Sequence, residues 1–215
     1  MYDLGHSFDS RAVAPGTNLL IEGPPMTGKR DLAFRILARG STDGEGAIVV
    51  TTKDSADRVQ DRYLEVAGVE DPLLGIVDCV TRQQGTGTPL EGELIRYASS
   101  PVDLTGIGIE LSELLQEFYQ DRGATENRVL LHSLSTLLMY SNLQTVFRFL
   151  HVFTGRIQSA DALGLFVIDS TGHDAQTMST LKQLFDGAIE VRETDGTREA
   201  RLVGVEDGTA WLDQP

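Results

Sequence analysis

Short apolar runs alternate along this chain with longer stretches in which apolar residues recur at helical spacing, and this alternation constrains the fold most strongly. The runs are rich in apolar and β-branched residues and bounded by glycine, as in Thr17–Gly23 and Gly46–Thr52, which is typical of buried strands. Strands that alternate with amphipathic helices predict an α/β domain with a mainly parallel central sheet flanked by helices. The predicted strands cover residues 17–23, 46–52, 75–80, a segment from 128, and 163–170, and the predicted helices cover 30–40, 54–68, 104–119, 143–153 and 175–185.

The C-terminal part of the chain has a different pattern. Residues 187–205 contain two strand-like segments on either side of Asp195-Gly196, a dipeptide that is typical of a tight β-hairpin turn. Residues 81–93 are polar and glycine-rich without periodicity, which predicts an exposed loop. No internal repeat or linker divides the sequence, so we expect a single domain over residues 1–215 with a C-terminal β-hairpin.

The chain is strongly acidic. It has 18 basic and 32 acidic residues, a formal net charge of −14, and acidic residues spread along its whole length. Such a surface repels phosphate backbones and disfavours nucleic-acid binding. Two interpretations remain open: an acidic face that binds a protein partner, and a surface adapted to high salt, where screening weakens self-repulsion.

The sequence also indicates the cellular compartment of the protein. No apolar run approaches the roughly 20 residues of a membrane-spanning helix, and the first sixteen residues lack the apolar core of a signal peptide. The single cysteine, Cys79, excludes an internal disulfide and suits a reducing environment. We therefore expect a cytoplasmic protein that does not associate with a membrane.

A G-x-x-x-x-G-K pattern follows the first predicted strand and precedes the first predicted helix. Its glycines allow backbone N–H groups to turn toward phosphate oxygens, and the helix N-terminus adds a favourable dipole. Lys29 is expected to reach the β- and γ-phosphates of ATP, or the β-phosphate of ADP, as a point charge. The alternative is a tight strand-to-helix turn with a surface lysine. The predicted phosphate-binding residues are Gly23, Pro24, Pro25, Met26, Thr27, Gly28, Lys29 and Arg30.

Arg30 departs from the phosphate-loop pattern, in which serine or threonine follows the lysine and its hydroxyl ligates Mg²⁺. A guanidinium cannot ligate a cation; it would repel the metal or replace part of its charge beside the phosphates. The sequence therefore favours nucleotide binding over metal-assisted hydrolysis and leaves the participation of Mg²⁺ open.

Together these features resemble the RecA-like P-loop ATPases, and within them the KaiC/RadA-like branch in a small, divergent, single-domain form found in halophilic archaea. The resemblance spans nearly the whole chain and is carried by residues 23–30, VVTTKDSADR (49–58) and RVLLHSLSTL (128–137). It implies a RecA-like fold with an ATP site. It also leaves a homo-oligomer open, because the family favours rings.

The resemblance implies positions for the residues of hydrolysis, and several of them differ here. Two acidic residues are expected after the second strand, where this chain has Lys53-Asp54; Asp54 is a candidate catalytic base or, alternatively, a helix cap. The aspartate expected to hold Mg²⁺ at the end of the fourth strand is His132. The lysine and arginine that such rings offer to a neighbouring nucleotide correspond to Gly204 and Glu206. These replacements indicate a degenerate catalytic site.

A second candidate for the acidic metal ligand ends the fifth predicted strand. Asp169 follows four apolar residues, with His173 nearby, and is a candidate metal ligand or a group that faces the γ-phosphate; alternatively it caps the next turn. No basic residue follows Arg201, so the last strand is not expected to supply a cation to phosphate.

Three hypotheses follow. The first is a nucleotide-binding regulatory or signalling protein, a pseudo-ATPase whose contacts with an unidentified protein partner depend on bound ATP or ADP. The second is a weak or divergent ATPase that uses Asp54 and Asp169. The third is an interaction module that binds no nucleotide.

Overall fold

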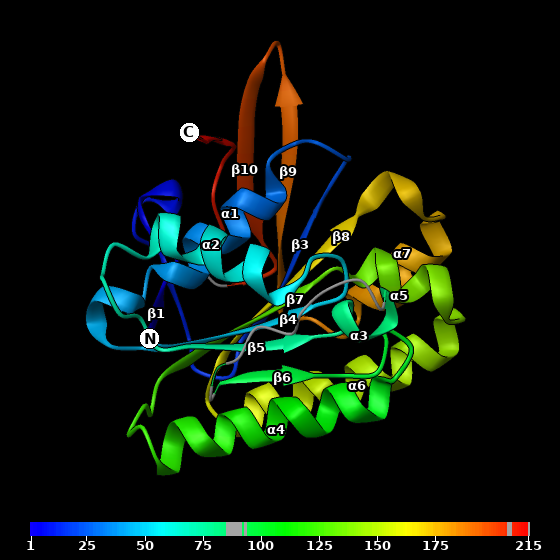
Figure 1. Cartoon of the computed structure of the whole chain (residues 1–215). Coiled ribbons are helices and arrows are strands. Elements are labelled where there is room, and N and C mark those ends of the chain that lie inside the picture. The colour runs from blue at the N-terminus through cyan, green and yellow to red at the C-terminus, as the bar shows by residue number, and fades with distance from the viewer. Residues whose placement is uncertain (85–91, 93, 206–207, 215) are drawn as a thin grey trace.

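A long β-sheet with helices on both faces forms the protein in the computed structural model, which describes residues 1–84, 92, 94–205 and 208–214 (Figure 1). In this part of the chain the strand order is β11-β10-β9-β3-β8-β7-β4-β5-β6; the seven strands from β9 to β6 are parallel, and β10 and β11 are antiparallel. The prediction of a mainly parallel α/β sheet with a C-terminal hairpin is confirmed. The strands of this sheet are β3 (Asn18–Gly23), β4 (Gly46–Thr51), β5 (Leu74–Asp78), β6 (Ile95–Tyr97), β7 (Asn127–His132), β8 (Leu163–Asp169), β9 (Gly187–Thr194), β10 (Thr197–Val203) and β11 (Leu212–Gln214).

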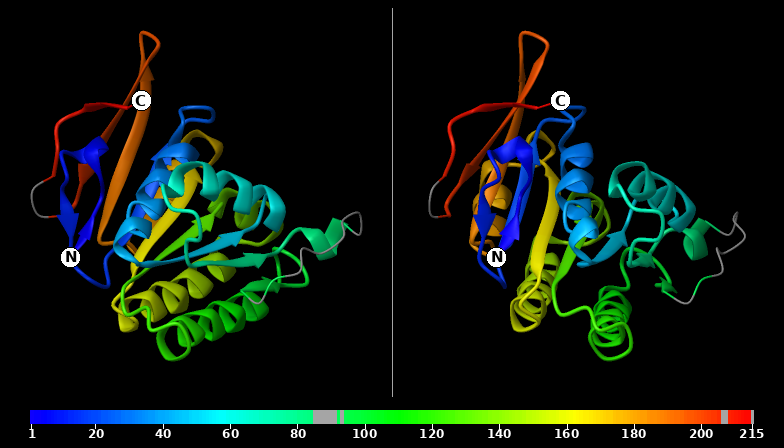
Figure 2. Two further views of the ribbon diagram at one scale, coloured as in Figure 1. Left: turned by 60° about the vertical axis from the view of Figure 1, so that its left-hand side comes forward. Right: turned by 90° about the vertical axis from the view of Figure 1, so that its left-hand side faces the viewer.

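The helices divide between the two faces of the sheet (Figure 2). Side-chain alternation along β3 explains this division, since Leu19 and Ile21 join the core beneath α1 and α2, whereas Leu20 joins the core beneath α4 to α7. All residues of β3, β4 and β7 are buried, as expected for parallel strands covered on both faces. The helices are α1 (Lys29–Ala38), α2 (Ala56–Ala67), α3 (Thr81–Gln84), α4 (Leu104–Gln120), α5 (Leu134–Tyr140), α6 (Leu143–Ser159) and α7 (Ala175–Lys182), with short 3-10 helices at His6–Phe8, Ser41–Asp43 and Ser170–Gly172.

The hairpin of β9 and β10 projects beyond the ends of the parallel strands (Figure 1). Its two turn residues, Asp195 and Gly196, have φ angles of 51° and 80°, as a type I′ turn requires. β9 also pairs in parallel with β3. The hairpin is therefore attached directly to the strand that leads into the G-x-x-x-x-G-K loop.

Several short elements were not predicted. The edge strands β6 and β11, and the separate two-stranded sheet of β1 (Tyr2–Asp3) and β2 (Ala12–Val13), have three residues or fewer, which is too short to show a period. The predicted exposed loop at 81–93 begins as helix α3. The amides of Val80, just before the helix, and of Thr81, its first residue, donate hydrogen bonds to the Asp78 carboxylate. Residues 85–91 and 93 lie outside the described part. Among the described helices, none combines the length and hydropathy needed to cross a bilayer.

Candidate phosphate-binding site

The loop between β3 and α1 has the backbone of an anion cradle. Gly28 precedes the helix in the left-handed region, with φ 79°, and the first helical hydrogen bond runs from the Leu32 amide to the Gly28 carbonyl. The amides of residues 29–31 therefore have no carbonyl acceptor within the helix, and they point outward from the N-terminus of α1. Pro24 and Pro25 carry no N–H group, so the donors of this loop come from its second half.

The first glycine of the loop is required for packing. A Cβ atom at Gly23 would lie 2.4 Å from the carbonyl oxygen of Val191 in β9. A side chain at this position would push the loop away from the hairpin strand. The two glycines of the pattern thus have different roles, one in close packing and one in a backbone turn.

Lys29 is buried inside the loop. Its ammonium group donates a hydrogen bond to the Pro24 carbonyl at 2.7 Å and forms an ion pair with the Asp169 carboxylate at 2.5 Å. Parallel pairing of β3 with β8 places Gly23 opposite Asp169, which explains why this carboxylate reaches the loop. The structure therefore places the candidate metal ligand Asp169 against the candidate phosphate-binding lysine.

Arg30 is held by a different carboxylate from the one that binds Lys29. Its guanidinium forms an ion pair with Asp54 at 2.6 Å and lies 5.8 Å from the centroid of the Phe34 ring. The Asp54 amide donates a hydrogen bond to Thr51 Oγ1, and Ser55 occupies the N-cap position of α2. Asp54, the candidate base, is thus held against a cation instead of facing free solvent.

His132 ends β7 and is buried beside the same ion pair. Its Nδ1 atom lies 3.9 Å from the Asp54 carboxylate, which is too long for a hydrogen bond. Burial, and after it the nearby cations, lower the pKa of His132 to about 3, so the imidazole is neutral at physiological pH. These cations are Arg30, Lys53, Arg62 and Lys29.

The side chains present here do not suit Mg²⁺, which prefers oxygen ligands. The hydroxyl and carboxylate that the resemblance implies are replaced by Arg30 and His132, and the remaining carboxylates, Asp54 and Asp169, are each engaged by a cation. In the described part of the chain, no group of three or more histidine, cysteine, aspartate or glutamate side chains is arranged to hold a metal ion.

A cleft of about 320 Å³ opens over the loop and contains an excess of positive charge. Its charged lining has four cations and two carboxylates, and Arg30 and Asp31 are already paired with Asp54 and Arg62 outside it. Within the described residues, Lys53 and Arg198 make no ion pair. The residues that line the cleft are Pro25, Met26, Gly28, Lys29, Arg30, Asp31, Lys53, His132, Ser133, Val167, Asp169 and Arg198.

The fold and family can now be assigned. Residues 16–191 match a family of unknown function, DUF7504. The chain belongs to the DUF7504 family. No curated protein matches its sequence.

Two solved structures from Pyrococcus horikoshii resemble this DUF7504 protein. The uncharacterized protein PH0321, solved in complex with an unknown peptide, has a TM-score of 0.67 and 13% identity, with 89% of this chain and 84% of PH0321 covered. The KaiC-like protein PH0186 has a TM-score of 0.60 and 13% identity, with coverage of 94% and 90%. At this identity the likeness establishes the fold, which is of the KaiC/RecA-like type.

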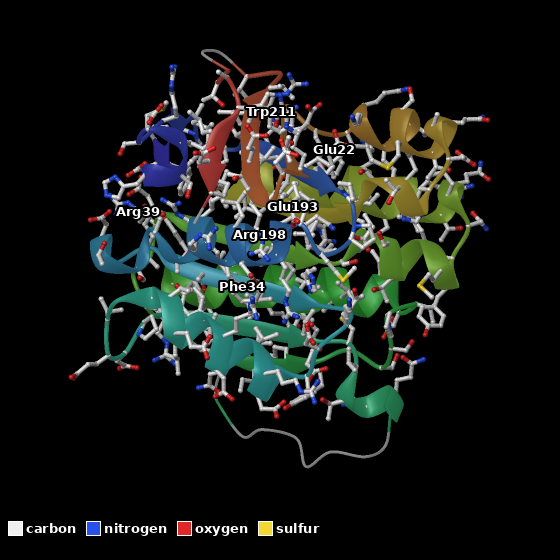
Figure 3. The ribbon with its side chains drawn as sticks, turned by 90° about the horizontal axis from the view of Figure 1, so that it is seen from above. Glu22, Phe34, Arg39, Glu193, Arg198 and Trp211 are labelled. Atoms are coloured by element: carbon white, nitrogen blue, oxygen red, sulfur yellow. The ribbon has the colours of Figure 1, made fainter. Side chains whose placement is uncertain are left out.

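The predicted residues of the DUF7504 protein come together to different degrees. Lys29, His132 and Asp169 line one cleft, and Asp54 lies directly behind Arg30. Glu206, predicted as a degenerate position, lies outside the described residues. The expectation that the last strand offers no cation past Arg201 overlooked a cation from earlier in the hairpin, Arg198 on β10 (Figure 3).

A contact of Ser135 with Asp169 and His173 was also not predicted from the sequence. The Ser135 hydroxyl accepts a hydrogen bond from the Asp169 amide at 3.0 Å and lies 3.0 Å from Nε2 of His173. Because the oxygen accepts from the amide, its own proton is free to donate to the imidazole. His173, noted in the sequence as a neighbour of Asp169, thus fixes the end of β8 through Ser135.

Proposed function

We propose that this DUF7504 protein binds ATP or ADP through the loop at residues 23–30 and acts as a regulatory or signalling protein that does not rely on metal-assisted hydrolysis. The observation that carries the proposal is the positive cleft at the end of β3, in a chain whose net charge is −14. Lys53 and Arg198 have no ion-pair partner among the described residues, and Lys29 is buried in the loop. An anion in the cleft would satisfy these cations and the amides of the α1 N-terminus together.

The acidic surface does not oppose such a site in concentrated salt. At about 1 M ionic strength the screening length is roughly 3 Å, so distant carboxylates no longer repel a polyphosphate. Contacts within the cleft are screened much less than exposed charges. We therefore place the protein in a cytoplasmic, high-salt setting, in line with its acidic composition.

The engaged carboxylates argue against hydrolysis. A general base needs a free lone pair within reach of the attacking water, and the Asp54 carboxylate is bound to Arg30 at 2.6 Å. The second candidate, a weak ATPase that uses Asp54 and Asp169, also depends on Asp169, whose side chain is 37% exposed beside Lys29. If phosphate displaced Asp169 from Lys29, the Asp169 carboxylate would be left at the cleft without its ion-pair partner.

A polypeptide partner is also part of the proposal. The structural neighbour PH0321 was solved with an unknown peptide, and the fold that it shares with this chain supports a partner of the same chemical class.

Calorimetric titration of ATP and ADP at multimolar KCl, with Mg²⁺ or with EDTA, tests the proposal. We expect micromolar binding that is nearly independent of metal. Lys29→Ala should lower the affinity by about tenfold to hundredfold, because a hydrogen bond to a charged group contributes roughly 1.5–3 kcal/mol. Arg148→Ala is the matched control, since Arg148 is an exposed cation on α6, on the other face of the sheet.

The outcomes separate the three hypotheses. Steady phosphate release that Asp54→Asn abolishes would overturn the proposal in favour of the weak ATPase. No heat of binding, together with a thermal midpoint that ATP leaves unchanged, would leave only the interaction module.

A further inference from the structure

Arg198 lies on the side of the hairpin that faces the phosphate loop. It alternates along β10 with Ala200 and Leu202, both of which belong to the core beneath α1. A Cβ atom at Gly28 would lie 3.1 Å from Cδ and from Nη1 of Arg198. Although Arg198 is exposed, its side chain therefore folds back onto the last glycine of the loop instead of extending into solvent.

The other two hairpin arginines have partners, and Arg198 does not. Arg192 pairs with Glu199, and Arg201 pairs with Glu190. Their guanidinium carbons lie 3.9 and 4.6 Å from the centroid of a Trp211 ring on the opposite side of the hairpin (Figure 3). In the described part of the chain, the cross-strand neighbour of Arg198, Glu193, does not form an ion pair with it.

The cleft that Arg198 lines holds more cations than carboxylates. It shares the cleft with Lys29, Arg30 and Lys53, and its charge contributes, after burial, to lowering the pKa of Arg35 on α1. A cation held among cations is unfavourable by its like-charge interactions. A ligand with several negative charges would relieve this repulsion.

We propose that Arg198 is a phosphate-binding residue, supplied to the loop by the hairpin of the same chain, and that a bound nucleoside polyphosphate thereby fixes the position of the hairpin. This inference rests on the proposed nucleotide site. A guanidinium offers a planar pair of donors to a phosphate and carries a permanent charge. It contributes positive charge without a metal ion, which accounts for a phosphate site whose side chains do not suit Mg²⁺.

The contact also gives the ligand a route to a distant surface. The hairpin is joined to the loop strand by β9, and Trp211, which immediately precedes β11, stacks against Arg192 and Arg201 on the other side of the hairpin. Anchoring Arg198 to phosphate restricts the motion of β10 and hence of this stack. Bound nucleotide then alters the mobility of the hairpin surface, away from the cleft.

Binding of ATP and of inorganic tripolyphosphate to the full chain in EDTA tests the assignment. We expect Arg198→Ala to weaken both ligands by about tenfold, and Arg198→Lys to weaken them less, because lysine keeps the charge but loses the fork. Arg192→Ala removes the same charge from the same hairpin on its opposite side and is expected to change affinity by less than about twofold. Equal affinity in Arg198→Ala and wild type would overturn the inference, as would a loss for ATP without a loss for tripolyphosphate.

Hydrogen exchange of the hairpin amides tests the second part. Saturating ATP should slow exchange of residues 187–203 in the wild type and leave it unchanged in Arg198→Ala, which a merely structural arginine would not produce. Equal protection in both proteins would contradict the anchoring role. If the wild type binds ATP and Lys29→Ala weakens binding as expected, while Arg198→Ala has no effect, only the Arg198 inference fails. If the wild type binds neither ligand, the proposed function fails first.

Discussion

The two sides of the cleft differ in the kind of ligand that their side chains suit. On the loop side, Lys29 and Arg198 sit against a left-handed glycine and the open N-terminus of α1, an arrangement that suits an anion. On the side formed by the ends of β4 and β7, Asp54 is neutralised by Arg30, His132 is uncharged and Lys53 adds a cation, so this side does not suit Mg²⁺. Phosphate binding and metal binding thus depend on different residues of a RecA-like site, and one set can be replaced while the other is kept.

Restoring the metal ligands should produce the largest change in this comparison. Arg30→Thr combined with His132→Asp replaces a cation and a neutral imidazole by a hydroxyl and a carboxylate, and releases Asp54 from its ion pair. We expect Mg²⁺ to tighten ATP binding to this double variant by about tenfold to hundredfold, the range over which ligand-shell changes alter metal affinity. Calorimetric titration with and without MgCl₂ measures it, with Arg30→Thr alone as the control. A comparable gain with Mg²⁺ in the wild type would show that the metal side is already functional.

The protonation state of His132 should be visible in stability. Above about pH 6.5 the imidazole is neutral in both the folded and the unfolded chain. Below pH 6.5 the unfolded chain binds a proton at His132, while the folded protein, with a pKa of about 3, does not. The free energy of unfolding should therefore decrease by about 1 kcal/mol for each pH unit from 6.5 toward 5.

Denaturant unfolding of the wild type and of His132→Asn at several pH values isolates this effect. The other three histidines are common to both proteins, so their contributions cancel in the difference. We expect the pH slope to be smaller in His132→Asn. Parallel slopes for the two proteins would mean that His132 is accessible to protons in the folded state, and the metal side would then be less closed than its geometry indicates.

The sequence predicted those parts of the site that depend on local pattern. The strand, the glycine at the helix N-terminus and a helix that begins at Lys29 follow from spacing within one strand–loop–helix unit, and the structure has all three. The type I′ turn at Asp195-Gly196 was recognisable for the same reason, since both residues tolerate positive φ.

Partnerships between distant segments could not be read from the same pattern. Arg198 reaches Gly28 only because β9 pairs with β3, and Asp169 reaches Lys29 only because β8 pairs with β3. The Arg30–Asp54 pair likewise depends on how α1 and the end of β4 are packed. Strand order and register decide these contacts, and no local period in the chain encodes them.

The two carboxylates of the site offer the finest test of the comparison. Asp169 neutralises Lys29 on the loop side, so phosphate must displace it before the lysine can bind. We expect Asp169→Asn to tighten ATP binding in EDTA by about two- to fivefold, which corresponds to the roughly 0.2–1 kcal/mol of a partly exposed ion pair. Asp54→Asn should have a smaller effect, because Arg30 is also held by the Phe34 ring. Calorimetric titration of both variants measures the two affinities. A weak ATPase that uses Asp169 predicts the opposite result, a loss of Mg²⁺-dependent binding and turnover in Asp169→Asn. Whether this substitution raises or lowers the affinity for ATP therefore decides whether Asp169 competes with the ligand or helps to bind it.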